Sequence, residues 1–480
     1  MMYLWNYVDG TLKEASDGGW FPVHEPATGE VYAMAPDSRA EDIDAAIEAA
    51  LSAFSAWSTS AAAERSRLMH RIADLMQTRL EDFAQAESRD TGKPVWLARM
   101  IDIPRAIDNF RFFAGAILHS SSEAHQTDTI ALNYTLRQPI GIAGCISPWN
   151  LPLYLFTWKI APALAAGNCV VAKPSEITPA TASLFAEICM EARLPAGVLN
   201  IVHGSGENVG AAITTHPDIA AVSFTGGTAT GATIARNAAP LFKKLSLELG
   251  GKNAALVFAD CDFEETVETV VGSAFSNQGE VCLCSSRIFI ERPLYERFRD
   301  AFVERVRELT VGDPLDDSTR QGALISPQHM EKVLSYIALA REEGGRILCG
   351  GERVQLEGRC AGGAFFSPTV IEGLPYNCRT NQEEIFGPVA TLLPFDSEAE
   401  VLTMANATRY GLAASVWTSN LTRAHRVAAA LQAGIVWVNC WMLRDLRTPF
   451  GGMKQSGVGR EGGWEALHFF TEAKNVCIKL

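Results

Sequence analysis

The feature that most constrains the fold of this chain is a series of four short apolar segments, each stopped by a polar or glycine-rich turn. These segments lie at residues 140–146, 168–172, 198–202 and 220–224. Helical stretches such as 179–192 lie between them, and strands joined in this way need right-handed crossovers and pair in parallel. Ligands bind at the carboxyl ends of the strands of such a sheet. We therefore expect a ligand site where the four turns come together.

A second series of the same kind follows the glycine pair Gly250 and Gly251. It predicts strands at 254–258, 287–290, 414–417 and 434–439, and helices at 295–309 and 329–343. Apolar residues at helical spacing between residues 40 and 89 predict further amphipathic helices ahead of the first sheet. Two consecutive α/β regions therefore meet near residue 250, and the cleft between them is the expected place for chemistry.

Composition excludes several classes of partner. The chain has 480 residues, and its 41 basic against 55 acidic side chains give a net charge of −14. This charge repels phosphate backbones, so we expect neither nucleic-acid nor membrane partners. The N-terminus lacks the basic start and apolar stretch of a signal peptide, and eleven scattered cysteines are too few for a disulfide framework. We expect a soluble, cytoplasmic protein with reduced thiols.

Cys282 differs from the other cysteines in its surroundings. It ends the polar, glycine-containing segment NQGEVC (277–282), which follows a predicted helix. A thiol with a pKa of about 8.5 is mostly protonated at neutral pH, so a nucleophilic cysteine needs help from its surroundings. Cys282 and Cys284 could instead form a metal or redox pair, but the nine histidines are dispersed and we expect no metal site. The cysteines expected to be ordinary packing residues are Cys145, Cys169, Cys189 and Cys440.

Glu248 is the candidate general base. It stands in the largely apolar segment LSLELGGK (245–252), where burial raises the pKa of a carboxyl toward the range useful for a base. The alternation of Ser246 and Glu248 equally fits an edge strand whose polar side chains face water. The sequence leaves these two interpretations open.

Two glycine-rich turns point toward a nucleotide. The turn at 204–210 has the spacing G-x-G-x-x-x-G, one residue longer than the usual dinucleotide fingerprint, and an ordinary glycine turn explains it equally well. The turn FTGGT (224–228) precedes a helix whose first N–H groups could bind an anion. Together with Lys173 and Glu176, which follow another strand, these turns favour a nucleotide ligand.

Over essentially its whole length, the chain resembles the aldehyde dehydrogenase superfamily. Seven motifs of that family occur in order: SPWN (147–150), KPSE (173–176), FTGG (224–227), LELGGK (247–252), NQGEVC (277–282), EEIFGP (383–388) and PFGG (449–452). The resemblance implies an α/β fold with two parallel-sheet domains and a small β element for oligomerisation. It assigns 1–119 and 138–249 to an NAD-binding domain, 250–448 to a catalytic domain, and 120–137 and 449–480 to the bridging element.

The resemblance also implies catalytic roles. Cys282 matches the nucleophile that attacks the aldehyde carbon and forms first a thiohemiacetal and then a thioester. Asn150 matches the side-chain donor that holds the developing oxyanion together with the backbone N–H of Cys282. Glu248 matches the base that activates water to hydrolyse the thioester, and Lys159 and Glu461 match positions linked to proton relay.

The chain departs from many members of the superfamily at Glu280, where glutamine is common. A carboxylate at this position either raises the pKa of the Cys282 thiol or faces away from it. Both interpretations remain open on the sequence.

The implied cofactor is NAD. The positions that match its contacts are Ile146, Trp149, Lys173, Ser175, Glu176, Gly206, Gly210, Phe224, Gly227, Thr230, Leu249, Glu384 and Phe386. Lys173 and Glu176 match residues on the adenosine ribose, and Glu384 matches a residue on the nicotinamide ribose. Since a carboxylate at Glu176 accepts hydrogen bonds from ribose hydroxyls and repels a 2′-phosphate, we predict a preference for NAD over NADP.

Two arginines point to a charged aldehyde substrate. Arg105 lies on an otherwise apolar helical face, and Arg444 lies in the loop before PFGG; both side chains suit a carboxylate. A surface pair of Arg444 with Asp445 is the competing explanation. The neighbouring segments resemble one subgroup of the family, the 2-hydroxymuconic and 2-aminomuconic semialdehyde dehydrogenases, in which these arginines are expected to clamp the substrate carboxylate.

Other functions remain possible on the sequence alone. A broad-specificity aldehyde dehydrogenase would use the same catalytic residues, and so would a cysteine esterase or thioesterase that needs no cofactor. A non-catalytic protein on the same fold is disfavoured because the nucleophile, the oxyanion donor and the base are all present. The C-terminal segment 475–480 alternates like an edge strand, which usually finds a partner, so we expect a homodimer or homotetramer.

Overall fold

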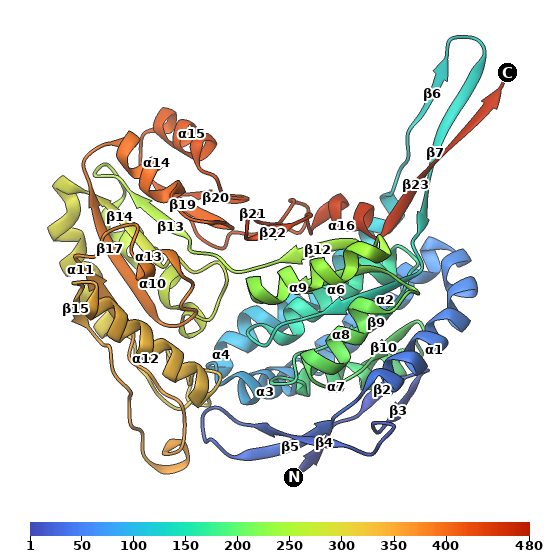
Figure 1. The fold of residues 1–480 in the computed structure, drawn as a ribbon, viewed down its shortest axis with the longest axis horizontal. Coiled ribbons are helices and arrows are strands. Elements are labelled where there is room, and N and C mark those ends of the chain that lie inside the picture. The colour runs from blue at the N-terminus through green and yellow to red at the C-terminus, as the bar shows by residue number, and fades with distance from the viewer.

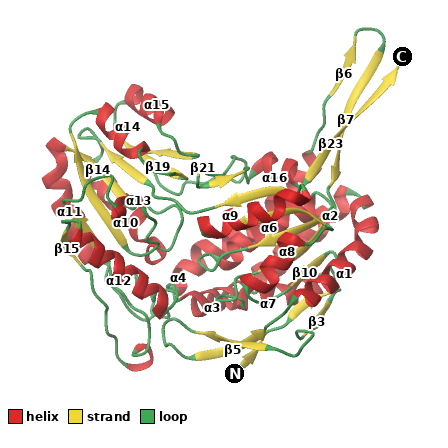
Figure 2. Cartoon of the chain, in the orientation of Figure 1, coloured by secondary structure: helices red, strands yellow, loops and turns green.

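The computed structural model describes residues 1–480 and shows two α/β units side by side, with a three-stranded arm that projects from the first (Figure 1). In both units helices surround the strands (Figure 2). None of the helices combines the length and the hydrophobicity that crossing a bilayer requires.

The first unit is built on an eight-stranded sheet. In spatial order its strands are β22 (Gly457–Val458), β12 (Lys244–Glu248), β11 (Ile219–Thr225), β8 (Ile142–Ile146), β9 (Cys169–Lys173), β10 (Leu199–Ile201), β2 (Asn6–Val8) and β3 (Thr11–Lys13). The strands from β12 to β10 run parallel, whereas β22, β2 and β3 are antiparallel to their neighbours. The four strands predicted from the apolar segments are confirmed. Their sequences are almost continuously apolar because helices cover both faces of the sheet.

The helices of the first unit lie in two layers. On one face are α6 (Pro152–Ala165) and α7 (Ala180–Glu191), backed by α2 (Ala62–Thr78), α3 (Leu80–Thr91) and α5 (Ile103–Ala116); on the other are α1 (Ala40–Thr59), α8 (Ala211–Thr215) and α9 (Thr228–Ala238). The short helix α4 (Val95–Leu97) and the π-helix η1 (Ala98–Asp102) link α3 to α5. The chain runs from β8 through β9 to β10 and then returns to β11 on the other side of β8. A crevice forms at such a reversal, and the turns after β8 and β11 flank it.

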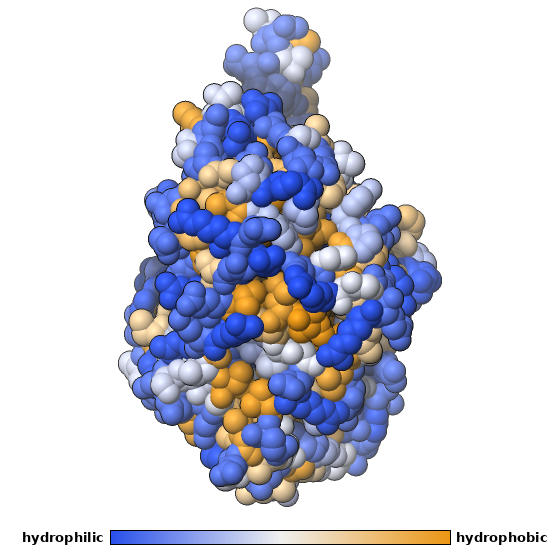
Figure 3. Space-filling model, turned by 90° about the vertical axis from the view of Figure 1, so that its left-hand side faces the viewer, coloured by the Kyte–Doolittle hydropathy of each residue, from blue (hydrophilic) through white to orange (hydrophobic).

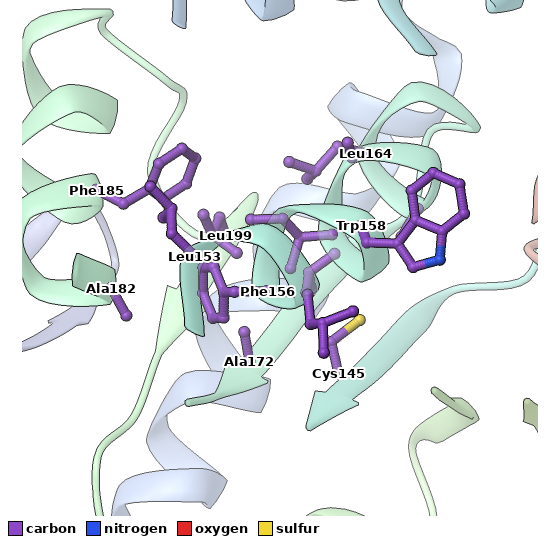
Figure 4. Close-up of a cluster of buried hydrophobic side chains, with 14 of the residues drawn as sticks. Cys145, Leu153, Phe156, Trp158, Leu164, Ala172, Ala182, Phe185 and Leu199 are labelled. Carbon is purple, nitrogen blue, oxygen red and sulfur yellow. The ribbon is translucent and has the colours of Figure 1, made fainter. Parts of the chain in front are cut away.

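Helix α6 lies at the centre of the core. All 14 of its residues are buried, as its almost continuous apolar sequence predicts. Figure 4 shows Phe156 of α6 beside Phe185 of α7, and their ring centroids are 6.0 Å apart. The side chains of Cys145, Cys169 and Cys189 are buried in the same cluster, whereas Cys440 is half-buried against it. One charged residue, Lys159, lies within this helix and therefore needs a partner.

The second unit is built on a seven-stranded sheet. In spatial order its strands are β15 (Arg346–Cys349), β16 (Thr369–Glu372), β17 (Val389–Phe395), β14 (Arg287–Glu291), β13 (Ala254–Val257), β19 (Ala413–Trp417) and β20 (Ile435–Val438). All except β15 are parallel to their neighbours. Its main helices are α10 (Phe263–Phe275), α11 (Tyr295–Arg307), α12 (Pro327–Glu342), α14 (Glu398–Asn406) and α15 (Leu421–Ala430). The predicted strands and helices of this region are confirmed, and β15, β16, β17, α14 and α15 are additional.

Three smaller sheets complete the fold. At the N-terminus, β5 (Val31–Pro36) pairs with β1 (Met2–Tyr3) and β4 (Trp20–His24), while β18 (Tyr410–Gly411) pairs with β21 (Met453–Lys454). The arm consists of β6 (Ala124–Thr127), β7 (Ala131–Pro139) and β23 (Thr471–Lys479), with β7 in the middle.

The C-terminal part of the expected bridging element is divided in the structure. Of residues 449–480, the arm takes only β23; β22 completes the first sheet, and α16 (Gly463–Phe469) packs against α6. The other expected segment, 120–137, falls short of the end of β7 at Pro139. The division has a physical reason, because β22 pairs with the otherwise open edge of β12 and binds its backbone groups.

The surface of the second unit is mostly polar. Figure 3 shows hydrophilic residues over most of this side, with a smaller apolar area near the centre. The apolar residues of this unit are instead gathered in three buried clusters around its sheet, as the hydrophobic effect requires.

Candidate active site

The loop of Cys282 has an unusual backbone. Helix α10 ends at Phe275, and Asn277 and Gln278 then adopt φ angles of +52° and +55°. Non-glycine residues rarely adopt positive φ, and they keep it only where the surroundings hold it. Here the side chain of Gln278 donates to the carbonyl of Ala323 at 3.2 Å. The loop that ends at Cys282 is therefore held in a strained conformation by its own side-chain amides.

Positive φ also occurs in two further segments that carry predicted site residues. Phe386, Asn439 and Met442 have φ angles of +61°, +51° and +58°. Phe386 belongs to the predicted cofactor contacts, and the other two precede Arg444. Strain of this kind concentrates at functional sites, where a fixed geometry is required.

Asn150 lies in the turn between β8 and α6, next to the loop of Cys282. Its side-chain Nδ2 donates to the carbonyl oxygen of Glu280 at 2.8 Å. Its own carbonyl accepts hydrogen bonds from Lys93 Nζ at 2.9 Å and from Asn277 Nδ2 at 3.2 Å. These bonds join the two units at the predicted nucleophile and the predicted oxyanion donor.

Cys282 and Asn150 line one cavity of about 250 Å³. Its other walls include Trp149, Leu249, Glu384, Phe386, His329, Lys332 and the glycine turn 225–227. The rings of Trp149 and Phe386 pack edge to face, with centroids 5.3 Å apart. The cavity therefore combines a thiol, an amide donor and an aromatic wall.

Glu248 is the last residue of β12 and only 4% exposed. Because β22 pairs with β12 and places Gly457 opposite Glu248, the interpretation of a water-facing edge residue is wrong. Burial raises the pKa of Glu248 well above its ordinary value, and the negative charge of Glu461 raises it further. Its Oε1 is buried and accepts no hydrogen bond within the chain. A carboxyl in this state suits a general base.

The Cys282 thiol lies in an environment that disfavours its anion. Burial raises its pKa most, the negative charges of Glu248 and Glu384 add to this, and the positive charge of Arg444 acts in the opposite direction. Such a thiol reacts only after a base has removed its proton. After burial, the charge of Glu248 contributes most to the pKa of the thiol.

Lys159, Ser223 and Glu461 form a buried hydrogen-bonded cluster beside Glu248. Lys159 Nζ donates to Glu461 Oε1 at 2.9 Å, and the Ser223 hydroxyl donates to the same oxygen at 3.1 Å. Lys159 is 1% exposed, and its charge lowers the pKa of Glu248. Lys159 and Glu461 were predicted as a relay pair, and Ser223 is an addition. The cluster can hold or pass a proton near Glu248.

A second cavity, of about 680 Å³, opens at the carboxyl ends of β8, β9 and β11. It shares Pro148, Trp149 and the turn 225–227 with the smaller cavity, so the two are adjoining. The predicted cofactor positions in its wall are Ile146, Trp149, Lys173, Ser175, Glu176, Gly206, Gly210, Phe224, Gly227 and Thr230. The others, Leu249, Glu384 and Phe386, line the smaller cavity.

Lys173 and Glu176 form an ion pair at this larger cavity. Lys173 Nζ lies 2.8 Å from Glu176 Oε2, and the backbone N–H of Gly206 donates to Oε1 at 3.3 Å. Partial burial acts to raise the pKa of Glu176, but the lysine charge and these hydrogen bonds hold it below its usual value. The carboxylate is therefore ionised at neutral pH, so it can accept hydrogen bonds from hydroxyls and repels phosphate.

Features of the cavity wall fit a nucleotide that approaches the backbone closely. A Cβ atom added to Gly227 would meet no atom within 4 Å, and one added to Gly206 or Gly210 would meet nothing closer than 3.8 Å. The packing of the chain therefore does not require glycine at these positions, whereas a ligand close to the backbone does. The buried hydroxyl groups of Thr225 and Thr228 have no hydrogen-bond partner within the chain. These residues fit a dinucleotide.

Arg105 and Arg444 meet at Tyr154. Their guanidinium carbons lie 5.8 and 5.7 Å from its ring centroid, and Arg444 donates to its hydroxyl at 2.5 Å. Asp445 pairs with Arg447 rather than with Arg444, so the surface-pair explanation of Arg444 is wrong. Nε and Nη2 of Arg105 are buried and donate no hydrogen bond within the chain. Buried charged donors without partners are costly, and they favour an anionic ligand.

Glu280 is directed away from the thiol. Its Oε1 accepts a hydrogen bond from the backbone N–H of Ile325 at 3.1 Å and lies 3.7 Å from His329 Nε2. Burial raises the pKa of this carboxyl well above its ordinary value. The structure agrees with the interpretation in which Glu280 faces away from the thiol.

Three residues at or near the cavity that holds Cys282 were not predicted. His329 and Lys332 lie in the first turns of α12, where nothing in the sequence separates them from an ordinary surface helix. Ser223 had a usable signal, because it is the one polar residue inside the predicted strand 220–224. A polar side chain in a strand buried on both faces needs a partner.

A family model described as "Aldehyde dehydrogenase family" matches residues 13–476. The 2-aminomuconic semialdehyde dehydrogenase of Danio rerio is 52% identical over 481 residues, covering 100% of this chain and 98% of that protein. The 2-hydroxymuconic semialdehyde dehydrogenase of Pseudomonas sp. (strain CF600) is 47% identical over 486 residues, with both chains fully covered.

A similar fold is found among solved structures. The NAD⁺ complex of an aldehyde dehydrogenase from Bacillus cereus superposes with a TM-score of 0.97 at 40% identity, covering 100% of this chain and 97% of that one. The α/β fold expected from the motifs is therefore confirmed.

Proposed function

The chain belongs to the aldehyde dehydrogenase family, and from this premise we propose that it oxidises a 2-aminomuconic or 2-hydroxymuconic semialdehyde to the dicarboxylate with NAD. As a member of this family it is an oxidoreductase. The observation that carries the proposal is the shared cavity of Cys282 and Asn150, which adjoins the nucleotide-sized cavity on one side. The unpaired guanidinium of Arg105 supports the charged substrate.

Cys282 is the proposed nucleophile. Its Sγ attacks the aldehyde carbon, and the carbonyl oxygen takes up the negative charge as the tetrahedral thiohemiacetal forms. The side-chain amide of Asn150 and the backbone N–H of Cys282 donate to this oxygen. Donors of this kind typically contribute about 3–4 kcal/mol each to the transition state, because the site excludes water.

NAD is the proposed oxidant, and the cavity residues fit it. When bound, NAD supplies the hydride acceptor that turns the thiohemiacetal into a thioester. Lys173 and Glu176 would hold the adenosine ribose, while Glu384 and Phe386 would hold the nicotinamide half. The ionised Glu176 carboxylate supports NAD over NADP, since a 2′-phosphate would bring a second negative charge beside it.

Glu248 is the proposed base for hydrolysis of the thioester. Its raised pKa makes the ionised carboxylate a stronger proton acceptor than an ordinary glutamate. The hydroxide equivalent attacks the thioester carbon, the carbonyl oxygen is again held by Asn150, and the Cys282 thiolate leaves with the acid product. Lys159, Ser223 and Glu461 form the hydrogen-bonded cluster through which the proton taken up by Glu248 can be returned to solvent.

Arg105 and Arg444 are the proposed clamp for the substrate carboxylate. A muconic semialdehyde carries its carboxylate at the end of the chain opposite the aldehyde. Guanidinium groups bind carboxylates through paired N–H donors, and Arg105 has two buried nitrogens free to do so. The clamp would hold the aldehyde end toward Cys282.

A substrate panel tests the proposal. The protein is assayed with muconic, short aliphatic and aromatic aldehydes, with NAD and with NADP, by the absorbance of the reduced nicotinamide. We expect the largest kcat/KM for a muconic semialdehyde with NAD. Arg105→Ala and Arg444→Ala should each raise KM for that substrate about 10- to 100-fold, the equivalent of a lost charged hydrogen bond, and leave KM for a neutral aldehyde within about twofold.

Arg447→Ala is the matched control, because Arg447 lies in the same loop but pairs with Asp445 at the surface. It should leave both KM values within about twofold. An unchanged KM for the muconic semialdehyde in the Arg105 and Arg444 variants would rule out the proposed clamp. Ester hydrolysis without any NAD-dependent oxidation would favour a cysteine esterase instead.

Assembly and location are also part of the proposal. The outer edge of β23 is unpaired, because β7 covers only one of its sides, and this supports a homodimer or homotetramer formed through the arm. All eleven cysteines are free, which supports a reducing, cytoplasmic location.

A further inference from the structure

A buried ionic cluster lies behind the turn that carries Asn150, and no step of the proposed reaction uses it. Its centre is Lys93, whose side chain is fully buried. Lys93 Nζ donates to Asp102 Oδ2 at 2.6 Å and to the carbonyl oxygen of Asn150 at 2.9 Å. Glu87 Oε1 lies 3.9 Å from the same amine. One lysine thus contacts the peptide group of the predicted oxyanion donor directly.

Lys93, Asp102 and Glu87 do not form a simple ion pair, because two buried carboxyls lie near one amine. Burial raises the pKa of Glu87 to about 8 and also raises the pKa of Asp102, while the charge of Lys93 lowers both. Asp102 is the carboxyl in direct contact with Lys93, at 2.6 Å against 3.9 Å for Glu87. Buried ion pairs contribute little net stability, because the desolvation of both charges offsets their attraction. Stability alone therefore does not explain a lysine at this position.

The cluster links two parts of the site that are distant in sequence. Asp102 ends the π-helix η1, three residues ahead of Arg105 in α5, and residues at this spacing lie on one side of a helix. Glu87 Oε2 accepts the backbone N–H of Leu153 at 3.3 Å, in the first turn of α6. The amine of Lys93 therefore connects the helix that carries Arg105 with the turn that carries Asn150.

We propose that Lys93 is a positioning residue for the oxidation of the aldehyde. Its amine fixes the peptide group of Asn150, so that the side-chain amide donates to the oxygen of the carbonyl that Cys282 attacks. Through Asp102 it keeps the helix of Arg105 in a constant position relative to that donor. The proposal rests on the proposed function, in which Asn150 holds the oxyanion.

The carbonyl oxygen of Asn150 accepts hydrogen bonds from two side chains. It accepts from Lys93 and also from Asn277 Nδ2 at 3.2 Å, and Asn277 belongs to the strained loop of the nucleophile. Two donors on one carbonyl oxygen restrict the rotation of that peptide more than one donor does. Because a misplacement of about 1 Å can cost about a hundredfold in rate, a fixed peptide at this position has a direct effect on kcat.

Two variants test the role of Lys93. Lys93→Met removes the donor and leaves Asp102 buried without its partner, so we expect a lower melting temperature. Lys93→Met combined with Asp102→Leu removes both charges and should restore most of that stability. In both variants we expect kcat to fall about 10- to 100-fold, with aldehydes that carry a carboxylate and with neutral ones.

Two further measurements separate positioning from general damage. The rate at which iodoacetamide alkylates Cys282 should stay within about twofold of the unmodified protein, because the thiol itself is unchanged. Hydrolysis of 4-nitrophenyl acetate without cofactor should fall by a factor similar to that of kcat, because it needs the same oxyanion donor.

Lys243→Met is the matched control. Lys243 is another buried lysine whose amine donates to backbone carbonyls, those of His216 and Ile219, but it precedes β12 and lies at the opposite end of that strand from Glu248. Its substitution should lower stability and leave kcat within about twofold.

A double variant that regains both melting temperature and kcat overturns the proposal, since the lysine would then only balance Asp102. Changed alkylation of Cys282 together with lost ester hydrolysis also overturns it, because the site as a whole would have been disturbed. If the unmodified protein oxidises no aldehyde with NAD, the proposed function fails, and the ester assay still reports whether Lys93 positions Asn150.

Discussion

At the scale of single residues, the candidate site places the proposed nucleophile and the proposed base in a buried and mutually repulsive environment. The negative charge of Glu248 raises the pKa of Cys282, and burial raises the pKa of both groups. Two such neighbours resist being ionised together. The Cys282 anion therefore forms more easily while Glu248 is protonated and neutral.

Glu248→Gln should separate the two halves of the reaction. We expect one rapid equivalent of reduced nicotinamide per site, followed by turnover about 10²- to 10³-fold slower, because the thioester lacks its base. In the unmodified protein kcat should rise with pH as Glu248 loses its proton, at a pH above the usual range of a glutamate because its pKa is raised. Stopped-flow absorbance and a pH profile measure both effects. A variant with an unchanged pH profile would exclude Glu248 as the base.

At the scale of elements, a single buried carboxyl joins two helices of the first unit. Asp90 lies in α3 and is fully buried. Its Oδ2 accepts the backbone N–H of Ala180 at 2.7 Å, at the start of α7, and its Oδ1 accepts the hydroxyl of Tyr32. Burial raises the pKa of Asp90 to about 7, although both hydrogen bonds oppose the shift.

This pKa makes the stability of the fold depend on pH. Because the pKa of Asp90 is higher in the folded state than in the unfolded one, its stabilising contribution is complete below about pH 4 and is lost as pH rises through about 7. Relative to Asp90→Asn, the unmodified protein should lose up to roughly 4 kcal/mol of stability over that window. Melting temperatures between pH 4 and 8 measure the difference. Asp82→Asn, exposed on the same helix, is the control and should follow the unmodified protein.

The arm of β6, β7 and β23 projects from the rest of the molecule (Figure 1). β23 pairs with β7 along its whole length of nine residues, and the arm extends away from both units (Figure 1). Several apolar residues remain exposed on it, including Ile130 at 58% and Ile478 at 47%. An exposed strand edge with apolar side chains favours pairing with a second chain.

Removal of residues 471–480 should abolish assembly without unfolding either unit. The truncation leaves α16 and the hydrogen bond from Asn168 to the carbonyl of Phe470 in place. We expect a monomer by light scattering, with a circular dichroism spectrum close to that of the full chain. Assembly that survives the truncation would assign the interface to another surface.

At the scale of the whole molecule, the site exists only between the two units. The first unit supplies Asn150 and the larger cavity, and the second supplies Cys282, Glu384 and Phe386. Hydrogen bonds from Asn150 to Glu280 and from Asn277 to Asn150 cross between them. A ligand that contacts both units therefore stabilises the native arrangement as a whole.

NAD should accordingly raise the melting temperature of the complete protein. At a concentration 100-fold above its dissociation constant the gain is about 2.7 kcal/mol, which corresponds to roughly a few degrees for a chain of this size. NADP at the same concentration should give a smaller shift, because the Glu176 carboxylate is ionised. Thermal unfolding with each nucleotide measures this, and equal shifts would contradict the predicted preference.

Local sequence was sufficient to predict much of the fold and the strongest candidate residues of the site. The strands β8, β9, β10 and β11 were predictable because burial on both faces leaves a continuous apolar segment, and Cys282 was recognisable from the polar, glycine-containing loop around it. The tertiary structure decided the rest. Glu248 is buried because β22 pairs with the edge of β12. Lys159 contacts Glu461, which lies 302 positions away in the sequence, and Arg105 and Arg444 both lie beside Tyr154. Hydrophobic periodicity reports only near neighbours along the chain, whereas these contacts follow from how separate elements pack together.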